Sequence, residues 1–202
     1  MLYYIIILSA MVIISVLDII FAMPVFNLSV GYIILAVVIS TIVEILISGL
    51  IAFIIRWILP RKWFTIDKKI YTASKGEVKF YDKINIKKWK EKVLELGCFT
   101  SFHKTKVAKP NDNEFIGRFI VESNYGVLIH FVSIFLGFLV IFIYPLKFFY
   151  LFGLPVSLVG AFLNLLPTFI LRYNLVKLHK IYNFNAKKEQ KLDSENIEFK
   201  VA

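Results

Sequence analysis

The stretch FIVESNYGVLIH, residues Phe119–His130, joins a basic polar segment to a long apolar run. It carries an acid, Glu122, and a histidine, His130, where the composition changes. About 20 apolar residues are enough for a helix to cross a bilayer. Ionisable side chains at a membrane boundary are costly and usually serve a function. The stretch therefore predicts a membrane span and a place where chemistry could occur.

Outward from this point, the chain is far more apolar than a soluble domain. It has 202 residues, of which 58% are hydrophobic and 16% aromatic, whereas soluble domains are about 45–50% apolar. We predict an all-α polytopic membrane protein with about four transmembrane helices arranged as two hairpins. The first apolar run lacks a basic start and a cleavage site, so we expect a retained anchor rather than a signal peptide. The four runs are Leu2–Met23, Leu28–Leu59, Val127–Tyr144 and Phe148–Leu171.

The positive charge is concentrated outside the spans. Of the 24 Lys and Arg residues, fifteen lie between Pro60 and Leu128 and seven between Arg172 and Ala202. The positive-inside rule places both segments in the cytoplasm, and with four crossings both termini lie there too. We expect a multi-pass protein of the cell membrane. A net charge of +10 should attract anionic lipid or an anionic substrate such as a coenzyme A thioester. We expect no nucleic-acid partner, because the basic residues lie beside membrane spans without a recognition motif.

The chain divides into four predicted regions. Within the second, the amphipathic pattern of Glu77–Leu96 predicts an interfacial helix capped by Gly97, and Pro110–Asn113 predicts a turn. The polar residues after Asn183 are expected to fray. The regions are an N-terminal transmembrane hairpin at 1–59, a basic cytoplasmic segment at 60–126, a C-terminal transmembrane hairpin at 127–171 and a cytoplasmic tail at 172–202.

Glu122 and His130 cannot form a simple pair on one straight helix. Eight residues correspond to about 12 Å along the axis and an offset of about 80°. Either the helix breaks near Gly126, or the two residues act on different parts of a substrate. Glu44, near the middle of the second run, is another candidate to orient His130. A histidine that only hydrogen-bonds between helices, and a solvated Glu122, remain the plainer alternatives.

Three different short motifs lie at the same predicted depth in the membrane. They are KKWK at Lys87–Lys90, FIVE at Phe119–Glu122 followed by LIH at Leu128–His130, and Asn164 followed eight residues later by RYN at Arg172–Asn174. In these motifs, from about Phe80 to Leu178, the sequence resembles the glycosyl-4,4'-diaponeurosporenoate acyltransferases. These membrane enzymes finish staphyloxanthin-type carotenoids. The resemblance implies transfer of a fatty acyl group to a sugar hydroxyl on a lipid, in a bacterial setting.

Such a reaction needs a base that deprotonates the sugar hydroxyl and hydrogen-bond donors that stabilise the oxyanion formed at the acyl carbonyl. We assign His130 as the catalytic base and Glu122 or Glu44 as the carboxylate that orients it. The acceptor would be a glycolipid or glycosylated isoprenoid in contact with membrane lipid. Acyl-CoA is the expected co-substrate, with no cofactor and no metal. The candidate substrate-binding residues are Lys88, Trp89, Lys90, Asn164, Arg172, Tyr173 and Asn174.

Two other classes of function fit the composition. A four-span protein with a basic face could bind lipid, confer immunity to a toxin or serve as a subunit of a complex, without catalysis. Transport is weaker, because the sequence shows no repeat symmetry for alternating access. The sequence leaves the oligomeric state open.

Overall fold

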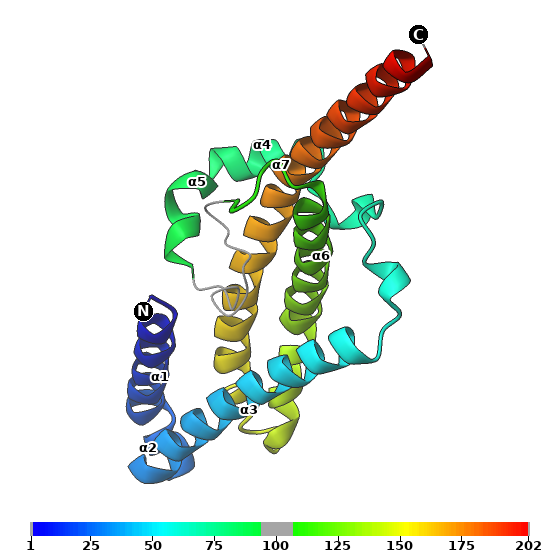
Figure 1. The fold of residues 1–202 in the computed structure, drawn as a ribbon. Helices are drawn as coiled ribbons and strands as arrows, with labels where there is room; N and C mark the ends of the chain where they lie inside the picture. Colours follow the sequence, from blue (N-terminus) through cyan, green and yellow to red (C-terminus); the bar gives the residue numbers. More distant parts are fainter. Residues whose placement is uncertain (1, 94–106, 202) are drawn as a thin grey trace. The chain divides into compact units, whose positions relative to one another are not determined.

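The structure is a computed structural model that describes the backbone of residues 2–93 and 107–201, and side chains at 4–93, 107–191 and 194. Within those ranges all regular secondary structure is helical (Figure 1). The elements are α1 (Leu2–Phe21), α2 (Met23–Phe26), α3 (Val30–Trp57), η1 (Arg61–Trp63), η2 (Lys69–Tyr71), α4 (Lys75–Lys83), α5 (Ile86–Trp89), η3 (Lys90–Lys92), α6 (Asn113–Leu136), η5 (Gly137–Ile143) and α7 (Gly153–Val201), where η marks a 3₁₀ helix.

Four helical segments in the described part of the chain are long and apolar enough to cross a membrane. They are Tyr4–Phe21, Val30–Trp57, Asn113–Ile143 and Gly153–Lys191. Many of their large apolar side chains are exposed, which is the expected pattern for surfaces that face lipid rather than water. The prediction of an all-α membrane protein with about four spans is confirmed.

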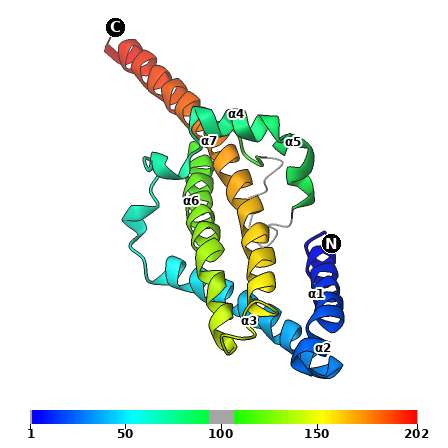
Figure 2. The ribbon, with the colours of Figure 1, turned by 180° about the vertical axis from the view of Figure 1, so that it is seen from behind.

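The helices group into two compact units, which we describe separately. The first is formed chiefly by residues 2–59 and 128–168, and the second chiefly by 60–91, 107–127 and 169–201. Both α6 and α7 therefore contribute residues to each unit. These two helices lie side by side in both ribbon views (Figures 1 and 2).

In the first unit, the hairpin of α1 and α3 closes through α2. Pro24 lies in the first turn of α2, where the ring costs no hydrogen bond. Asn27 then leaves the helix with a φ of 52°, and the Ser29 side chain caps α3 by accepting from the Tyr32 amide at 3.2 Å. The apolar residues packed around this hairpin are Ile14, Ala22, Ile33, Ala36, Val37, Leu151, Phe152 and Val156.

Hydrogen bonds attach the second hairpin to this core. The Tyr144 hydroxyl donates to the Ala36 carbonyl of α3 at 2.8 Å. The same hydroxyl lies 2.8 Å from the Ser40 hydroxyl of α3. Within the second hairpin, the Ser157 hydroxyl of α7 donates to the Gly137 carbonyl of η5 at 3.2 Å. Because α7 begins at Gly153 and not near Phe148, Pro155 lies in the first helical turn and disrupts no backbone bond.

In the second unit, an aromatic stack and one amide fix the segment that follows α3. The rings of Phe64 and Tyr125 stack with centroids 3.8 Å apart. The buried Asn124 side chain of α6 donates to the carbonyls of Phe64 and Thr65, both at 3.1 Å. These contacts tie the residues after α3 to the cytoplasmic end predicted for α6.

Two predictions about this unit are wrong. The expected single helix from Glu77 is broken, because Asn85 adopts a left-handed backbone with a φ of 55° between α4 and α5. Its predicted cap, Gly97, lies outside the described residues.

The tail after Asn183 does not fray but continues α7 to Val201. Lysine, glutamate and glutamine are good helix formers, and the Asn185 side chain donates to the Pro110 carbonyl at 2.9 Å. The predicted turn at Pro110 is present.

Candidate functional site

His130 of α6 makes one specific polar contact, with Asn164 of α7 in the same unit. Its Nδ1 lies 2.9 Å from the Asn164 Oδ1. The Asn164 Nδ2 donates to the Gly160 carbonyl at 3.0 Å, which fixes the amide with its oxygen toward the histidine. An amide oxygen only accepts, so Nδ1 must carry the proton. The Nε2 of a neutral His130 is then left with a lone pair that can accept a proton.

Glu44 of α3 is buried within the first unit, with 9% of its surface exposed. Its Oε1 has no hydrogen-bond partner among the described residues. The carboxyl group lies against two glycines. A Cβ added to Gly160 would come within 2.5 Å of its carboxyl carbon, and one added to Gly137 within 3.3 Å of its Oε1. A cavity of about 30 Å³ borders Glu44 and Gly160, enough room for a water molecule.

Glu44 packs against α7 and does not make the predicted contact with the Nδ1 of His130. The partner of the His130 Nδ1 is an amide, Asn164, and not a carboxylate. Glu44 packs instead on Gly160, whose carbonyl holds that amide. Glu44 therefore supports the same face of α7 that orients His130.

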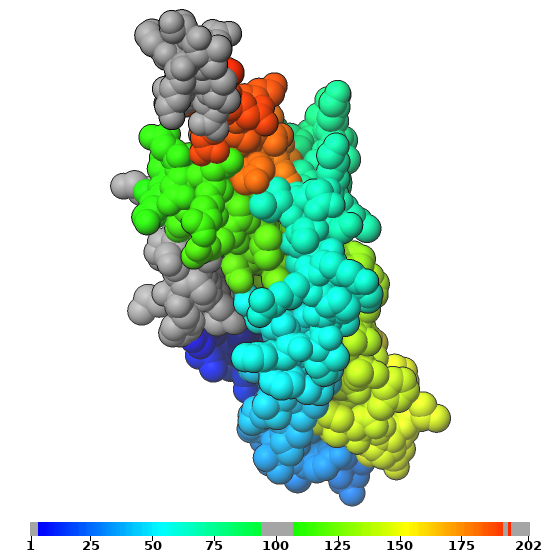
Figure 3. Space-filling model, turned by 45° about the vertical axis from the view of Figure 1, so that its right-hand side comes forward, coloured from blue at the N-terminus to red at the C-terminus, as the bar shows by residue number. Residues whose placement is uncertain are grey.

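Glu122 belongs to the second unit, whereas His130 belongs to the first. The break that could have joined them is absent, because α6 continues as a helix through Gly126. Glu122 lines a groove of about 960 Å³ that is bordered by α6, α7 and Ile66. Figure 3 shows the start of α6 in green beside the segment around residue 66 in cyan, with α7 in orange. Besides Glu122, the charged residues that line it are Glu114, Arg118 and Glu189.

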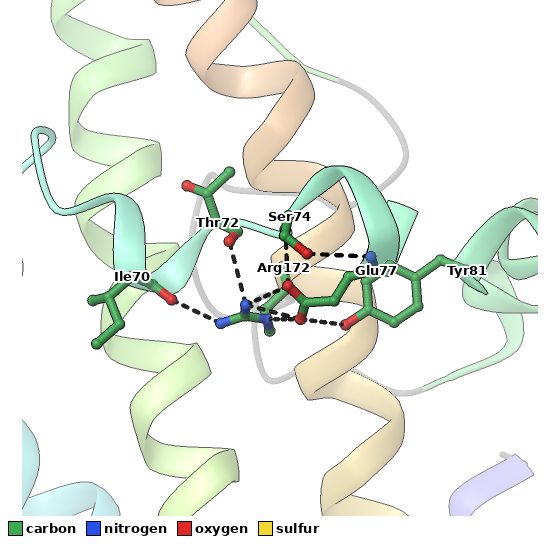
Figure 4. Close-up of polar contacts among 6 residues, drawn as sticks. All are labelled: Ile70, Thr72, Ser74, Glu77, Tyr81 and Arg172. Atoms are coloured by element: carbon green, nitrogen blue, oxygen red, sulfur yellow. Dashed lines mark hydrogen bonds and ion pairs between the residues drawn. The ribbon is translucent and has the colours of Figure 1, made fainter. Parts of the chain in front are cut away.

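Arg172 is engaged by protein groups on several sides (Figure 4). Its Nε and Nη2 donate to the two carboxylate oxygens of Glu77, each at 2.9 Å. Its Nη1 donates to the Ile70 carbonyl at 2.8 Å, and Nη2 also to the Thr72 carbonyl at 3.3 Å. We call this arrangement the Arg172 clamp. It ties α7 to the segment before α4, and substrate binding by Arg172 stays a prediction that this geometry does not favour.

Glu77 forms the other half of the clamp. Its carboxylate accepts from the Ser74 amide at 2.8 Å while the Ser74 hydroxyl accepts from the Glu77 amide, a capping box that begins α4. The hydrogen bonds from Arg172, and then those from Ser74, lower the pKa of Glu77 to about 2, against the opposing effect of partial burial. The carboxylate is therefore charged at neutral pH.

Next along α7, Tyr173 and Asn174 face a groove of about 410 Å³. The Tyr173 hydroxyl donates to Asp82 at 3.0 Å, and the Lys90 Nζ donates to the Asn174 Oδ1 at 3.4 Å. We call it the basic groove, because four lysines line it. The lining residues are Val78, Lys87, Lys90, Tyr173, Asn174, Val176, Lys177 and Lys180.

The other two residues of the KKWK motif have different surroundings. The Trp89 indole donates to the Ile84 carbonyl at 3.0 Å and so closes the turn between α4 and α5. Lys88 is exposed and is absent from the residues that line the basic groove. Their role in substrate binding stays a prediction.

Sequence reasoning missed Gly160, Glu77, Lys177 and Lys180. The pattern Ser74–Glu77 is a capping-box signature, and it could have marked Glu77 as a helix-start residue. Residues three and four apart share a helix face, so Lys177 and Lys180 could have been grouped with Tyr173. No sequence signal pointed to Gly160, because its role depends on the approach of α3. Among the described residues, no three His, Cys, Asp or Glu side chains gather as a metal site would require.

Comparison with known families supports the resemblance that was drawn from the three motifs. A family model described as glycosyl-4,4'-diaponeurosporenoate acyltransferase matches residues 60–183, which is more than half of the chain and includes all three motifs. The match leaves out α1 and α3, and with them Glu44. Searches of curated proteins and of solved structures gave no match. On the strength of the match over residues 60–183, the chain belongs to the glycosyl-4,4'-diaponeurosporenoate acyltransferase family.

Proposed function

We propose that the protein transfers a fatty acyl group from acyl-CoA to a sugar hydroxyl of a glycosylated carotenoid or related glycolipid, with His130 as general base. The observation that carries the proposal is the contact between His130 and Asn164. The amide of Asn164 is itself fixed by Gly160, so it holds the imidazole with Nε2 as the acceptor. The family described for residues 60–183 supplies the reaction class.

In the proposed reaction, the Nε2 of His130 removes the proton from the sugar hydroxyl. The alkoxide oxygen attacks the thioester carbonyl carbon and forms a tetrahedral oxyanion. The oxyanion collapses, the carbon–sulfur bond breaks, and the proton returns from His130 to the thiolate sulfur. The products are an acyl ester and free coenzyme A, and no oxidant or metal is needed.

The setting supports this chemistry. Both the acyl chain and a carotenoid acceptor are apolar, and four segments of the described chain are able to span a bilayer. A thioester donor is water-soluble at its phosphorylated end and apolar at the other, so the reaction belongs at a membrane boundary. Fifteen of the 24 basic residues lie between Pro60 and Leu128, which supports a cytoplasmic location for the donor.

The other candidates take supporting roles in the proposal. Glu44 fixes the face of α7 that presents Asn164, and the Arg172 clamp positions Tyr173 and Asn174 beside the basic groove. Glu122 remains a candidate for substrate contact within its own groove. Each is a positioning or binding role and not part of the proton transfer.

Acylation assays in membranes test the base directly. His130→Ala is expected to lower kcat by about 10²–10⁴-fold, which is the usual contribution of a general base. Asn164→Ala is expected to lower kcat by about tenfold, because the wrong tautomer becomes available. Asn164→Asp keeps an acceptor for Nδ1–H but loses the amide donor to the Gly160 carbonyl, so it is expected to recover only part of that loss. Full turnover by a folded His130→Ala variant would reject His130 as the base.

The alternative hypothesis, a membrane protein without enzymatic activity, predicts a different result in cells. Deletion of the gene in its host should remove one acylated glycolipid and accumulate the unacylated precursor, as measured by untargeted lipid analysis. Complementation with the wild-type chain should restore the product, and complementation with His130→Ala should not. An unchanged lipid profile after deletion would instead favour lipid binding, immunity or a subunit role.

A further inference from the structure

The basic groove is built entirely within the second unit from two separate stretches of chain. Val78, Lys87 and Lys90 come from the segment of α4, α5 and η3. The remaining residues come from about two turns of α7, from Tyr173 to Lys180. Its volume of about 410 Å³ lies within the range of small-molecule sites.

The charged residues that line the basic groove are all positive. Four lysines line it and no acidic residue does. Asp82, outside the lining set, lies 3.3 Å from the Lys87 Nζ and offsets that charge. Lys177 and Lys180 make no ion pair with any residue in the described part of the chain, so their charges remain available for a ligand.

The residue spacing on α7 places the lysine side chains on the helix face that lines the basic groove. Tyr173, Lys177 and Lys180 are separated by four and three residues, so they share one helical face. Leu175 and Leu178 are buried on another face, which holds α7 in this rotation. At the groove wall, Val78 and Val176 add apolar surface beside the Tyr173 ring.

We propose that the basic groove binds the phosphate groups of the acyl donor, the phosphorylated nucleotide end of a coenzyme A thioester. The inference rests on the proposed acyl transfer for the identity of the donor. Ammonium groups make strong charge-assisted hydrogen bonds to phosphate oxygens, and the apolar wall beside them suits a nucleotide base. A phospholipid headgroup offers the same phosphate chemistry, so the experiment must separate the two sources.

The direct test is binding of adenosine 3',5'-bisphosphate, which carries phosphates and a base but no acyl chain, to the full-length protein in nanodiscs. Calorimetry should detect binding that weakens as salt rises, because charge attraction is screened. Lys177→Ala combined with Lys180→Ala should weaken the Kd by about tenfold or more. The matched control is Lys187→Ala with Lys188→Ala, two exposed lysines farther along α7, which should leave the Kd within about twofold.

Two arms distinguish the sources of phosphate. In nanodiscs of neutral phosphatidylcholine, the donor proposal predicts binding of the bisphosphate and a raised KM for acyl-CoA in the Lys177/Lys180 variant. Binding of the bisphosphate should persist when anionic phosphatidylglycerol replaces the neutral lipid. Loss of all bisphosphate binding in phosphatidylglycerol nanodiscs would assign the groove to a lipid headgroup and overturn the proposal. An unchanged Kd in a Lys177/Lys180 variant that elutes normally on size exclusion would overturn it as well.

The same variants keep this inference separable from the proposed reaction. His130→Ala should bind the bisphosphate as the wild type does while losing turnover, because His130 belongs to the other unit. If His130→Ala were fully active but the Lys177/Lys180 variant lost binding, the groove would stand and the proposed base would fail. If His130→Ala were inactive but removal of the lysines left binding intact, the base would stand and the groove would fail.

Discussion

At Gly160, α7 passes so close to Glu44 that a larger side chain does not fit unless the acid moves. A Cβ at this position would lie 2.5 Å from the Glu44 carboxyl carbon and 3.0 Å from its Cγ. The acid is nine-tenths buried, so moving aside would take its carboxyl group into the adjoining cavity of about 30 Å³. The glycine thus allows an ionisable residue of α3 to approach the helix that orients His130.

We expect Gly160→Ala to lower the free energy of unfolding by about 1–3 kcal/mol, the usual cost of overpacking. The gain in helix propensity, about 1 kcal/mol, offsets only part of the clash. In a Glu44→Ala background the same substitution should cost much less, since the opposing carboxyl group is gone. Thermal unfolding in detergent of the two single variants and the double variant measures this coupling.

Gly49→Ala is the matched control for Gly160, because a Cβ on Gly49 of α3 would meet no atom within 4 Å. It should be neutral or stabilising by up to about 1 kcal/mol. Equal effects of Gly160→Ala in the presence and absence of the Glu44 side chain would contradict the proposed close approach.

Glu77 makes stability depend on pH in a predictable direction. Its pKa falls from 4.5 to about 2 in the folded chain, chiefly because Arg172 donates to its carboxylate. A lowered folded-state pKa means that the stabilisation is fully present above about pH 4.5 and is lost as the pH falls toward about 2. Thermal unfolding across this window should show a steeper loss for the wild type than for Glu77→Gln.

Above that window, Glu77→Gln should cost about 1 kcal/mol, a value reduced because the carboxylate is 36% exposed and screened by water. Glu114→Gln provides the control, since Glu114 also pairs with an arginine but in a largely exposed position. It should change stability by less than about 0.5 kcal/mol. A pH profile of Glu77→Gln parallel to that of the wild type would exclude the clamp as the cause.

At the scale of elements, apolar length predicted the four spans because a bilayer demands about 20 apolar residues of each helix. The break between α4 and α5 was not predictable, because apolar spacing continues through Ile84, although the backbone leaves the helix there with a ψ of 9° and becomes left-handed at Asn85. The extension of α7 beyond Asn183 did have a local signal, the helix-forming Lys, Glu and Gln residues, which the polar composition of the tail outweighed in the prediction. The contact of Asn185 with Pro110 joins residues far apart in sequence and was not predictable.

The left-handed Asn85 gives a test of that break. For most residues with a Cβ, this conformation costs about 1–2 kcal/mol, whereas glycine adopts it freely. Asn85→Ala should therefore destabilise the α4–α5 corner, and Asn85→Gly should be neutral or mildly stabilising. Hydrogen exchange of the α4 and α5 amides reports the difference, with the exposed Lys79→Ala as a neutral control. A stabilised Asn85→Ala variant would indicate that the two helices fuse into one.

At the scale of the whole molecule, the candidate residues fall into two units. The His130–Asn164 contact belongs to the first unit, and the Arg172 clamp and basic groove belong to the second. The same two helices, α6 and α7, run through both units. The sequence placed these residues at one membrane level from helix rise alone, but it could not assign their partners, because those depend on how side chains of different helices meet.

Topology is the prediction that belongs to the whole chain. Apart from Arg56, the only basic residue outside the two basic segments is Lys147, in the turn between η5 and α7. The positive-inside rule therefore places Lys147 outside the cell and Lys188 in the cytoplasm. In a Cys98→Ser background, a membrane-impermeant thiol reagent should label Lys147→Cys on intact cells and Lys188→Cys only after the cells are opened. The cysteine-free parent should show no signal. Labelling of both positions from outside would mean that α7 does not cross the membrane, and the reverse pattern would place the basic groove on the outer face, away from any cytoplasmic acyl donor.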